Sequence, residues 1–139
     1  MTRREAREAA LSMLFALGYT PDKDAETLLS EYEDEFDGAT DPYVKAAVTG
    51  VLATLAELDA TIAEAAVGWT MSRISRVSMA ILRLACYELL HMPEIPVRVS
   101  INEAVELSKS YDDEKAYSFV NGVLNRIKES EAVAAVSHA

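Results

Sequence analysis

The fold is decided by two segments of the C-terminal half, SINEAVEL (100–107) and FVNGVL (119–124). Ser100 and Glu103 have the spacing of a capping box ahead of an apolar run, which predicts a helix with Ser100 as its N-cap. The second segment has a 3.6-residue apolar period, which predicts another helix starting near Asp112 rather than the hairpin that an Asn-Gly pair often marks.

Four more helices are predicted upstream, because apolar residues recur there every three or four positions. They span about 2–17, 22–38, 42–62 and 74–91. Together the patterns predict an all-α fold, a helical bundle of about six to seven helices in two packed halves. Residues 1–130 should form a single domain and 131–139 a disordered tail. We expect Gly122 to lie where its helix closely crosses another backbone.

Composition limits the class of protein. The chain has 139 residues, half of them hydrophobic, which is enough for one domain with a sizeable core. It has no run of the roughly 20 apolar residues that cross a bilayer, and its start is amphipathic, so we expect a soluble cytoplasmic protein with no membrane partner. Cys86 is the only cysteine and should be a core residue, and His91 and His138 lack the neighbours of a zinc site. We therefore expect no metal and no cofactor.

Charge is unevenly distributed along the chain. The net charge of -10 argues against nucleic acid, but nine acidic residues fall between positions 22 and 41 with one base among them. The arginines cluster elsewhere, at Arg3, Arg4, Arg7, Arg73, Arg76 and Arg83. Arginines at a helix start are unfavourable by about 0.3–1 kcal/mol each, so they are either a solvated basic end or a functional group. Arg83, in a nearly apolar stretch, is either at the rim of the core or held by a partner.

These segments resemble a known family. The opening pair of segments, together with RREARE (3–8), WTMSRI (69–74) and AILRLACYEL (80–89), is similar to the NusB family of bacterial transcription antitermination factors. The resemblance spans residues 3–127 and is weak over 22–41. It implies a non-enzymatic role in transcription elongation complexes on ribosomal RNA operons. There, NusB proteins bind single-stranded boxA RNA together with the ribosomal protein NusE. Some members form homodimers, which would cover part of the arginine-bearing surface.

The resemblance also implies site residues. The RNA-binding candidates are Arg3, Arg4, Arg7, Arg73, Arg83, Lys109, Tyr111, Lys115 and Phe119. Cations meet phosphates and aromatic rings stack on unpaired bases, so these residue types suit single-stranded RNA. Tyr111 is the better stacking candidate, because Phe119 shares its helix face with core valines. The partner-binding candidates are Phe15, where many relatives carry tyrosine, and Ser78 and Met79, where an acidic and a basic residue are common.

Two other functions remain open from the sequence. A protein-protein interaction module with weak or no RNA binding is favoured by the acidic total and by Ser78 and Met79. An enzyme-associated domain is less favoured, since rRNA cytosine methyltransferases carry a similar domain but this chain has no cofactor-binding region. The sequence has no paired nucleophile and base and no phosphate loop, so we expect no catalysis.

Overall fold

The computed structural model describes residues 1–36 and 41–138, and every regular element in these ranges is a helix. The elements are α1 (Arg3–Leu17), α2 (Ala25–Phe36), α3 (Pro42–Ala53), α4 (Leu55–Ala65), the short 3-10 helix η1 (Met71–Arg73), α5 (Arg76–His91), α6 (Val97–Tyr111), α7 (Ala116–Lys128) and α8 (Glu131–Ala134). The predicted all-α fold is confirmed, with eight α-helices in the described ranges where six or seven were expected. The expected end of the second helix at Gly38 lies outside the described residues.

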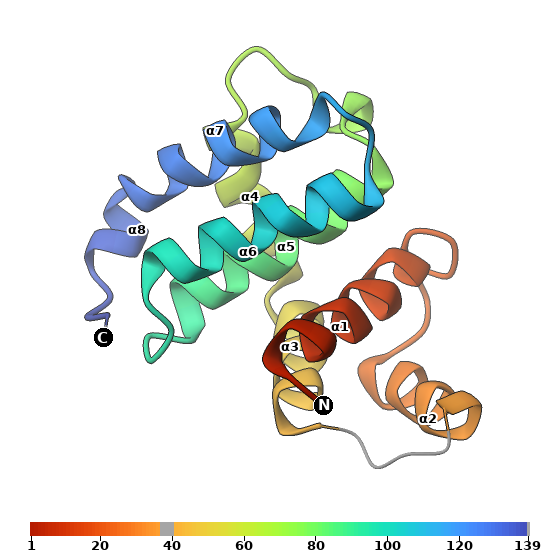
Figure 1. The fold of residues 1–139 in the computed structure, drawn as a ribbon. Helices are drawn as coiled ribbons and strands as arrows, with labels where there is room; N and C mark the ends of the chain where they lie inside the picture. Colours follow the sequence, from red (N-terminus) through yellow and green to blue (C-terminus); the bar gives the residue numbers. More distant parts are fainter. Residues whose placement is uncertain (37–40, 139) are drawn as a thin grey trace.

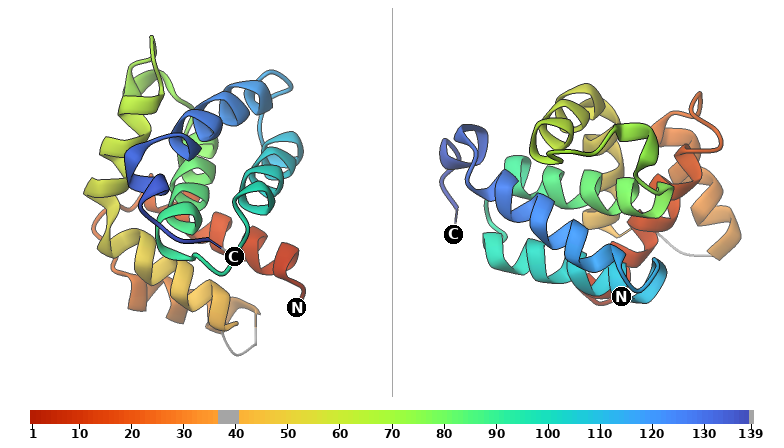
Figure 2. Two further views of the ribbon diagram at one scale, coloured as in Figure 1. Left: turned by 90° about the vertical axis from the view of Figure 1, so that its left-hand side faces the viewer. Right: turned by 90° about the horizontal axis from the view of Figure 1, so that it is seen from above.

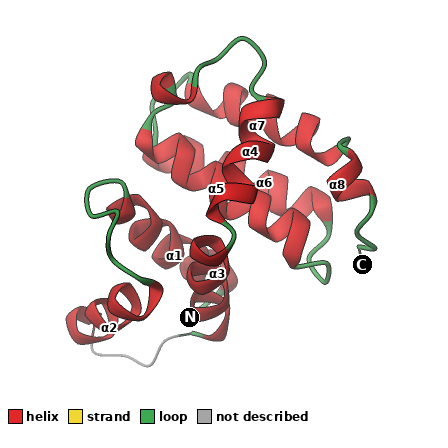
Figure 3. Ribbon diagram, turned by 180° about the vertical axis from the view of Figure 1, so that it is seen from behind, coloured by secondary structure: helices red, strands yellow, loops and turns green. Residues whose placement is uncertain are grey.

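The helices pack in two groups. Helices α1, α2 and α3 form an N-terminal group, and α4 to α8 form a C-terminal group (Figures 1 and 3). Helix α5 is central, because it contacts α1 and α3 of the first group and α4, α6, α7 and α8 of its own. Figure 2 shows α5 between α4 and α6 in its left panel. The site described below lies on the elements that surround α5.

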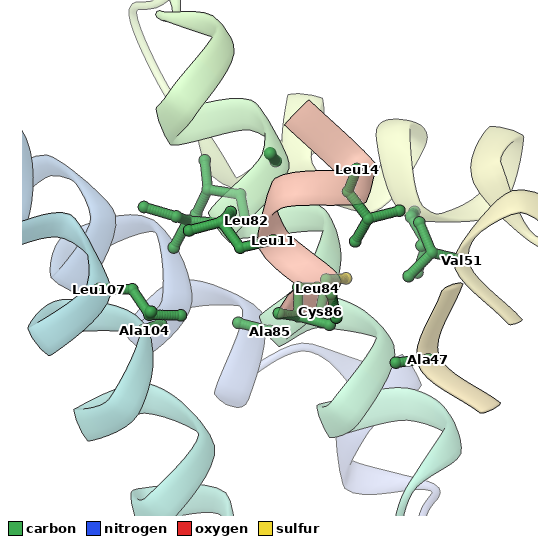
Figure 4. Close-up of a cluster of buried hydrophobic side chains, with 14 of the residues drawn as sticks. Leu11, Leu14, Ala47, Val51, Leu82, Leu84, Ala85, Cys86, Ala104 and Leu107 are labelled. Atoms are coloured by element: carbon green, nitrogen blue, oxygen red, sulfur yellow. The ribbon is translucent and has the colours of Figure 1, made fainter. Parts of the chain in front are cut away.

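The core lies around α5. Leu82, Leu84 and Cys86 of this helix are buried, and they meet α1 through Leu11 and Leu14 (Figure 4). The same figure shows Ala47 and Val51 of α3 on one side and Ala104 and Leu107 of α6 on the other. Burying large aliphatic side chains stabilises a fold by about 1.5–3 kcal/mol each, so this cluster fixes α1, α3 and α6 against α5.

The predicted helix over 42–62 is wrong as one continuous element. It breaks at Thr54, and α3 and α4 meet at an angle of 78°. The Thr54 hydroxyl donates to the Gly50 carbonyl at 2.7 Å, and the Thr54 backbone leaves the helical region. A hydroxyl that competes for a backbone acceptor in this way favours a bend. The break lets α4 turn and pack on α5 and α7.

Two glycines differ from expectation. A Cβ at Gly122 would have no other atom within 4 Å, so the predicted close crossing there is wrong. The close approach is at Gly50 of α3, where a Cβ would lie 2.0 Å from the hydroxyl oxygen of Tyr87 in α5. The Tyr87 ring therefore fills the space that a side chain at position 50 would need.

Helix starts also differ in the C-terminal half. Helix α6 begins at Val97, directly after Pro96, so Ser100 lies inside the helix and is not its N-cap. Proline is well suited to a helix start, and here it overrides the apparent capping box. Helix α7 begins at Ala116, four residues after Asp112, because the Asp112 side chain is engaged elsewhere.

Residues 131–138, where the sequence predicts a disordered tail, include a short helix in the structure. Helix α8 starts after the N-cap Ser130, and Val133 is buried. His138 Nε2 lies 2.8 Å from the Leu89 carbonyl oxygen. That carbonyl has no helical partner four residues on, because position 93 is proline and has no N–H. Separately, no single helix in the described part of the chain is long and apolar enough to cross a membrane.

Candidate nucleic-acid interface

Arg7 is a core residue, not a surface one. Its side chain forms two hydrogen bonds to Glu88, Nε to Oε2 at 2.9 Å and Nη2 to Oε1 at 3.0 Å, and the two residues are only 4% and 2% exposed. Tyr43 and Ser100 also donate to Glu88, so one carboxylate joins α1, α3, α5 and α6. Burial alone would lower the pKa of Arg7, but Glu88 raises it above the ordinary value. The donors of Arg7, a predicted RNA contact, thus point into the core and are engaged by Glu88.

Arg83 is held by a partner, which resolves the two alternatives left by the sequence. Its Nε and Nη2 donate to the Asp59 carboxylate of α4 at 2.8 and 2.9 Å. The pair is partly buried and fastens α4 to α5. A guanidinium held by both ends of its fork has little left to offer a phosphate.

Four candidates lie on α1 or α6, two helices that the Arg4–Glu103 and Tyr111–Glu8 contacts join. The Arg3 guanidinium lies 4.7 Å from the centre of the Tyr43 ring, a cation–π contact at the exposed start of α1. Arg4 pairs with Glu103 of α6, and the Tyr111 hydroxyl donates to Glu8 of α1.

Lys109, the fourth of these candidates, has two neighbours. Its Nζ lies 3.6 Å from Glu106 and 5.1 Å from the centre of the Tyr117 ring. The α1–α6 edge, defined here as Arg3, Arg4, Lys109 and Tyr111, thus combines cations and an exposed aromatic ring with neighbouring carboxylates.

Three candidates gather around a cavity next to this edge. The cavity has a volume of about 600 Å³, and Arg73, Lys115 and Phe119 line it. Phe119 is half-buried and packs against Trp69, with 4.8 Å between the ring centres. Trp69 is 52% exposed and also lines the cavity. We call Trp69, Arg73, Lys115 and Phe119 the Trp69 cavity.

The cations of the Trp69 cavity differ from those described above. None of the described residues forms an ion pair with Arg73 or Lys115, and both are exposed. Arg126 also lines the cavity and donates to the Ala65 carbonyl. Cations beside an accessible aromatic ring such as Trp69 suit single-stranded RNA, so this is the best-formed part of the candidate interface.

Trp69 and Arg126 are functional candidates that sequence reasoning missed. Trp69 stands in a connection without periodicity, and Arg126 looked like an ordinary charge in the last turn of a helix. The signal that was available for Trp69 is its type: an isolated tryptophan beside a glycine in a polar loop has no core to explain it.

Ser78 and Met79, the predicted partner contacts on α5, are buried in the structure. The hydroxyls of Ser75 and Ser78 donate to the Asp112 carboxylate at 3.0 and 2.5 Å. Asp112 directly follows Tyr111 and also lines the Trp69 cavity, so these bonds tie the α6–α7 connection to the start of α5. The two parts of the interface therefore adjoin at Tyr111 and Asp112.

Phe15, the remaining partner candidate, is half-buried at the end of α1. Its ring meets the exposed Tyr19 ring edge-on, with centres 5.5 Å apart, and the Arg76 guanidinium lies 4.2 Å from the Tyr19 ring centre. Arg76 also donates to the Gly18 carbonyl at 3.0 Å. Phe15, Tyr19 and Arg76 thus form a separate aromatic and cationic patch.

The fold and this surface define an all-α protein built to contact other macromolecules. The sequence matches the NusB family over residues 4–129. The transcription antitermination protein NusB of Clostridium botulinum (strain Alaska E43 / Type E3) is 43% identical over 130 residues, which cover 91% of this chain and 98% of that protein. T. maritima NusB superposes with a TM-score of 0.82 at 36% identity, over 95% of this chain and 94% of its own.

A further solved structure contains antitermination factors NusB and NusE in complex with dsRNA. One of its chains superposes with a TM-score of 0.79 at 28% identity, over 91% of this chain and 97% of its own. This chain belongs to the NusB family of transcription antitermination factors, which are not enzymes.

Proposed function

We propose that this chain binds single-stranded boxA-type RNA together with NusE, as part of the transcription elongation complex in the cytoplasm. The observation that carries the proposal is the Trp69 cavity, where two cations without an ion pair among the described residues lie with the exposed Trp69 ring and the half-buried Phe119 ring. An unstacked base can lie against an aromatic face while the neighbouring cations meet its phosphates. The solved structure of NusB and NusE with dsRNA supports RNA and NusE as partners by analogy.

The proposed RNA path continues from the cavity onto the α1–α6 edge. Tyr111 links the two parts of the path. It is next in sequence to Asp112, which lines the cavity, and its hydroxyl donates to Glu8 of α1. Arg3 and Arg4 lie farther along the same edge, at the start of α1. Arg7 and Arg83 are left out of the path, since carboxylates hold both guanidinium groups.

We assign NusE to the patch of Phe15, Tyr19 and Arg76. Exposed aromatic side chains with an arginine are typical of the centre of a protein interface. The acidic helix α2 follows directly after this patch in the chain and would attract a basic ribosomal protein. Tyr19→Ala should therefore weaken NusE binding, whereas binding of RNA alone should not change.

A homodimer that forms through the α1–α6 edge is also part of the proposal. It would cover Arg3 and Arg4, so dimer and RNA would compete for the same surface. Sedimentation with and without RNA measures this competition, and a dimer that remains intact when saturated with RNA would end the idea.

The test is an anisotropy titration of labelled boxA-type RNA against a scrambled RNA of equal composition, with and without NusE. We expect tighter binding to the boxA-type RNA and a further gain with NusE. Arg73→Ala and Lys115→Ala should each flatten the dependence of log affinity on log salt by about one unit. Arg98→Ala is the matched control, because Arg98 is exposed on α6 away from the cavity residues. Equal effects of all three substitutions would contradict the proposed site.

The second candidate is a protein-interaction module with weak or no RNA binding. It is favoured by one observation: Arg4, Arg7 and Arg83, three of the five arginines expected at RNA, are paired with carboxylates. This alternative predicts that NusE binds equally well with and without boxA-type RNA. A ternary complex that is tighter than either binary complex would rule it out.

A further inference from the structure

In the free protein, the carboxylate of Glu103 already binds the guanidinium of Arg4, one of the arginines proposed to bind RNA. Arg4 donates to both carboxylate oxygens of Glu103, Nε to Oε2 and Nη2 to Oε1, each at 3.2 Å. This is the same side of the guanidinium fork that would bind a phosphate in a bidentate manner. One anion therefore has to leave before the other can take its place.

We infer that Glu103 is a built-in competitor of RNA: it holds Arg4 in the free protein and lowers RNA affinity until a phosphate displaces it. This inference rests on the proposed RNA-binding function. The two partners differ in exposure, with side chains 62% exposed for Arg4 and 21% for Glu103. Glu103 is therefore the fixed member on the surface of α6, and Arg4 is the member that can swing outward.

The surroundings of Arg4 strengthen the competition. The groove between α1 and α6 is lined by the carboxylates of Glu8, Glu103 and Glu106. Glu8 accepts from Tyr111, and Glu106 pairs with Lys109, so carboxylates also engage these two RNA candidates. Arg4 is the one cation among the described residues that line this groove with the three carboxylates, so the groove is net negative before RNA arrives.

The Trp69 cavity offers a contrast within the same molecule. Arg73 and Lys115 have no ion-pair partner among the described residues, so a phosphate can bind there without displacing a carboxylate. We therefore expect an order of binding. RNA binds at the Trp69 cavity first, and Arg4 contributes to RNA binding only after its pair with Glu103 is broken. In the unaltered chain Arg4 should contribute little to affinity, since breaking its pair offsets the new contact.

The test is a double-mutant cycle measured by anisotropy with boxA-type RNA at one fixed salt concentration. Glu103→Gln keeps the shape of the side chain and removes its charge. It should tighten binding about threefold to tenfold, which is the size expected for one exposed charge near a phosphate. Arg4→Ala should weaken binding less than about threefold in the unaltered chain, but should abolish the gain when combined with Glu103→Gln.

Glu94→Gln is the matched control for net charge. Glu94 is exposed in the connection between α5 and α6 and forms no ion pair within the described ranges. It should leave RNA affinity nearly unchanged. A gain with Glu94→Gln equal to that with Glu103→Gln would overturn the inference, and so would a Glu103→Gln gain that survives Arg4→Ala.

The outcomes also separate this inference from the proposed function. If the unaltered chain binds boxA-type RNA and Glu103→Gln binds equally well, only the competitor role fails. If neither binds, the proposed RNA function fails and the inference with it. If Glu103→Gln binds boxA-type RNA and the unaltered chain does not, the result would support the competitor role most strongly. Thermal unfolding of each variant checks that all remain folded.

Discussion

Arg7 and Glu88 are 81 positions apart in the sequence, yet Arg7 Nε lies 2.9 Å from Glu88 Oε2 in the interior of the protein. Tyr43 and Ser100 complete the hydrogen bonds of this carboxylate. Burial next to Glu88 also raises the pKa of the Tyr43 hydroxyl, so the phenol stays protonated and keeps donating. An arginine expected on the RNA surface is thus the centre of the contact between α1 and α5.

The first prediction concerns this buried pair. Glu88→Gln leaves the Arg7 charge without a counterion in the core, so it should lower the free energy of unfolding by about 3–5 kcal/mol. Denaturant unfolding followed by circular dichroism measures the loss. Glu103→Gln is the control, because it neutralises an exposed pair and should cost far less stability. Equal small losses in both variants would show that Arg7 does not depend on Glu88.

The second prediction concerns two glycines in helices. Gly50→Ala should destabilise the fold by about 1–3 kcal/mol, because the new methyl group would collide with the Tyr87 ring. Gly122→Ala should instead stabilise it by up to about 1 kcal/mol, since its Cβ meets no atom and alanine favours a helix. Thermal or denaturant unfolding compares the two. In a Tyr87→Leu background the Gly50→Ala loss should shrink, and an unchanged loss would contradict the ring collision.

The third prediction uses the only cysteine of the chain. Cys86 is fully buried, and burial raises the pKa of its thiol to about 12. Because the thiolate is the reactive form, the native protein should resist a thiol reagent at about pH 8 and react only after unfolding. Labelling time courses with and without denaturant measure this. Rapid labelling of the native protein would mean that the α5 core opens readily.

Sequence reasoning succeeded where local signals decide the structure. Thr2 and Glu5 form a capping box that starts α1, and Asp41 followed by Pro42 starts α3, close to the predicted starts near positions 2 and 42. The all-α class followed from such signals because each one acts within a few residues of itself.

Prediction from the sequence failed where a contact with a residue far away in the sequence determines the position of a side chain. Ser100 is not the helix cap that its spacing predicts, and Arg7, a predicted RNA contact, lies in the core, because both donate to Glu88. The spacing of Arg7 from Ala10 and Leu14 places it on the core face of α1, which was the available warning. Glu88, a carboxylate within an almost wholly apolar helix, was the second warning.

The candidate site was predicted in part for the same reason. Arg73, Lys115 and Phe119, which the resemblance proposes as RNA contacts, line one cavity, but the ring that pairs with Phe119 comes from a loop 50 positions earlier. No pattern of spacing connects Trp69 to α7. Only the packing of α4 and α7 against α5 brings that loop to the cavity.

The most direct test of the account is the emission of Trp69, the only tryptophan of the chain, during titration with boxA-type RNA. The account predicts a saturable change in emission with the same Kd as RNA binding by anisotropy. Phe119→Ala should weaken binding by about 1–3 kcal/mol through lost stacking, whereas Tyr19→Ala, an exposed aromatic control, should not. RNA that binds tightly while Trp69 emission stays constant and Phe119→Ala has no effect would contradict the account.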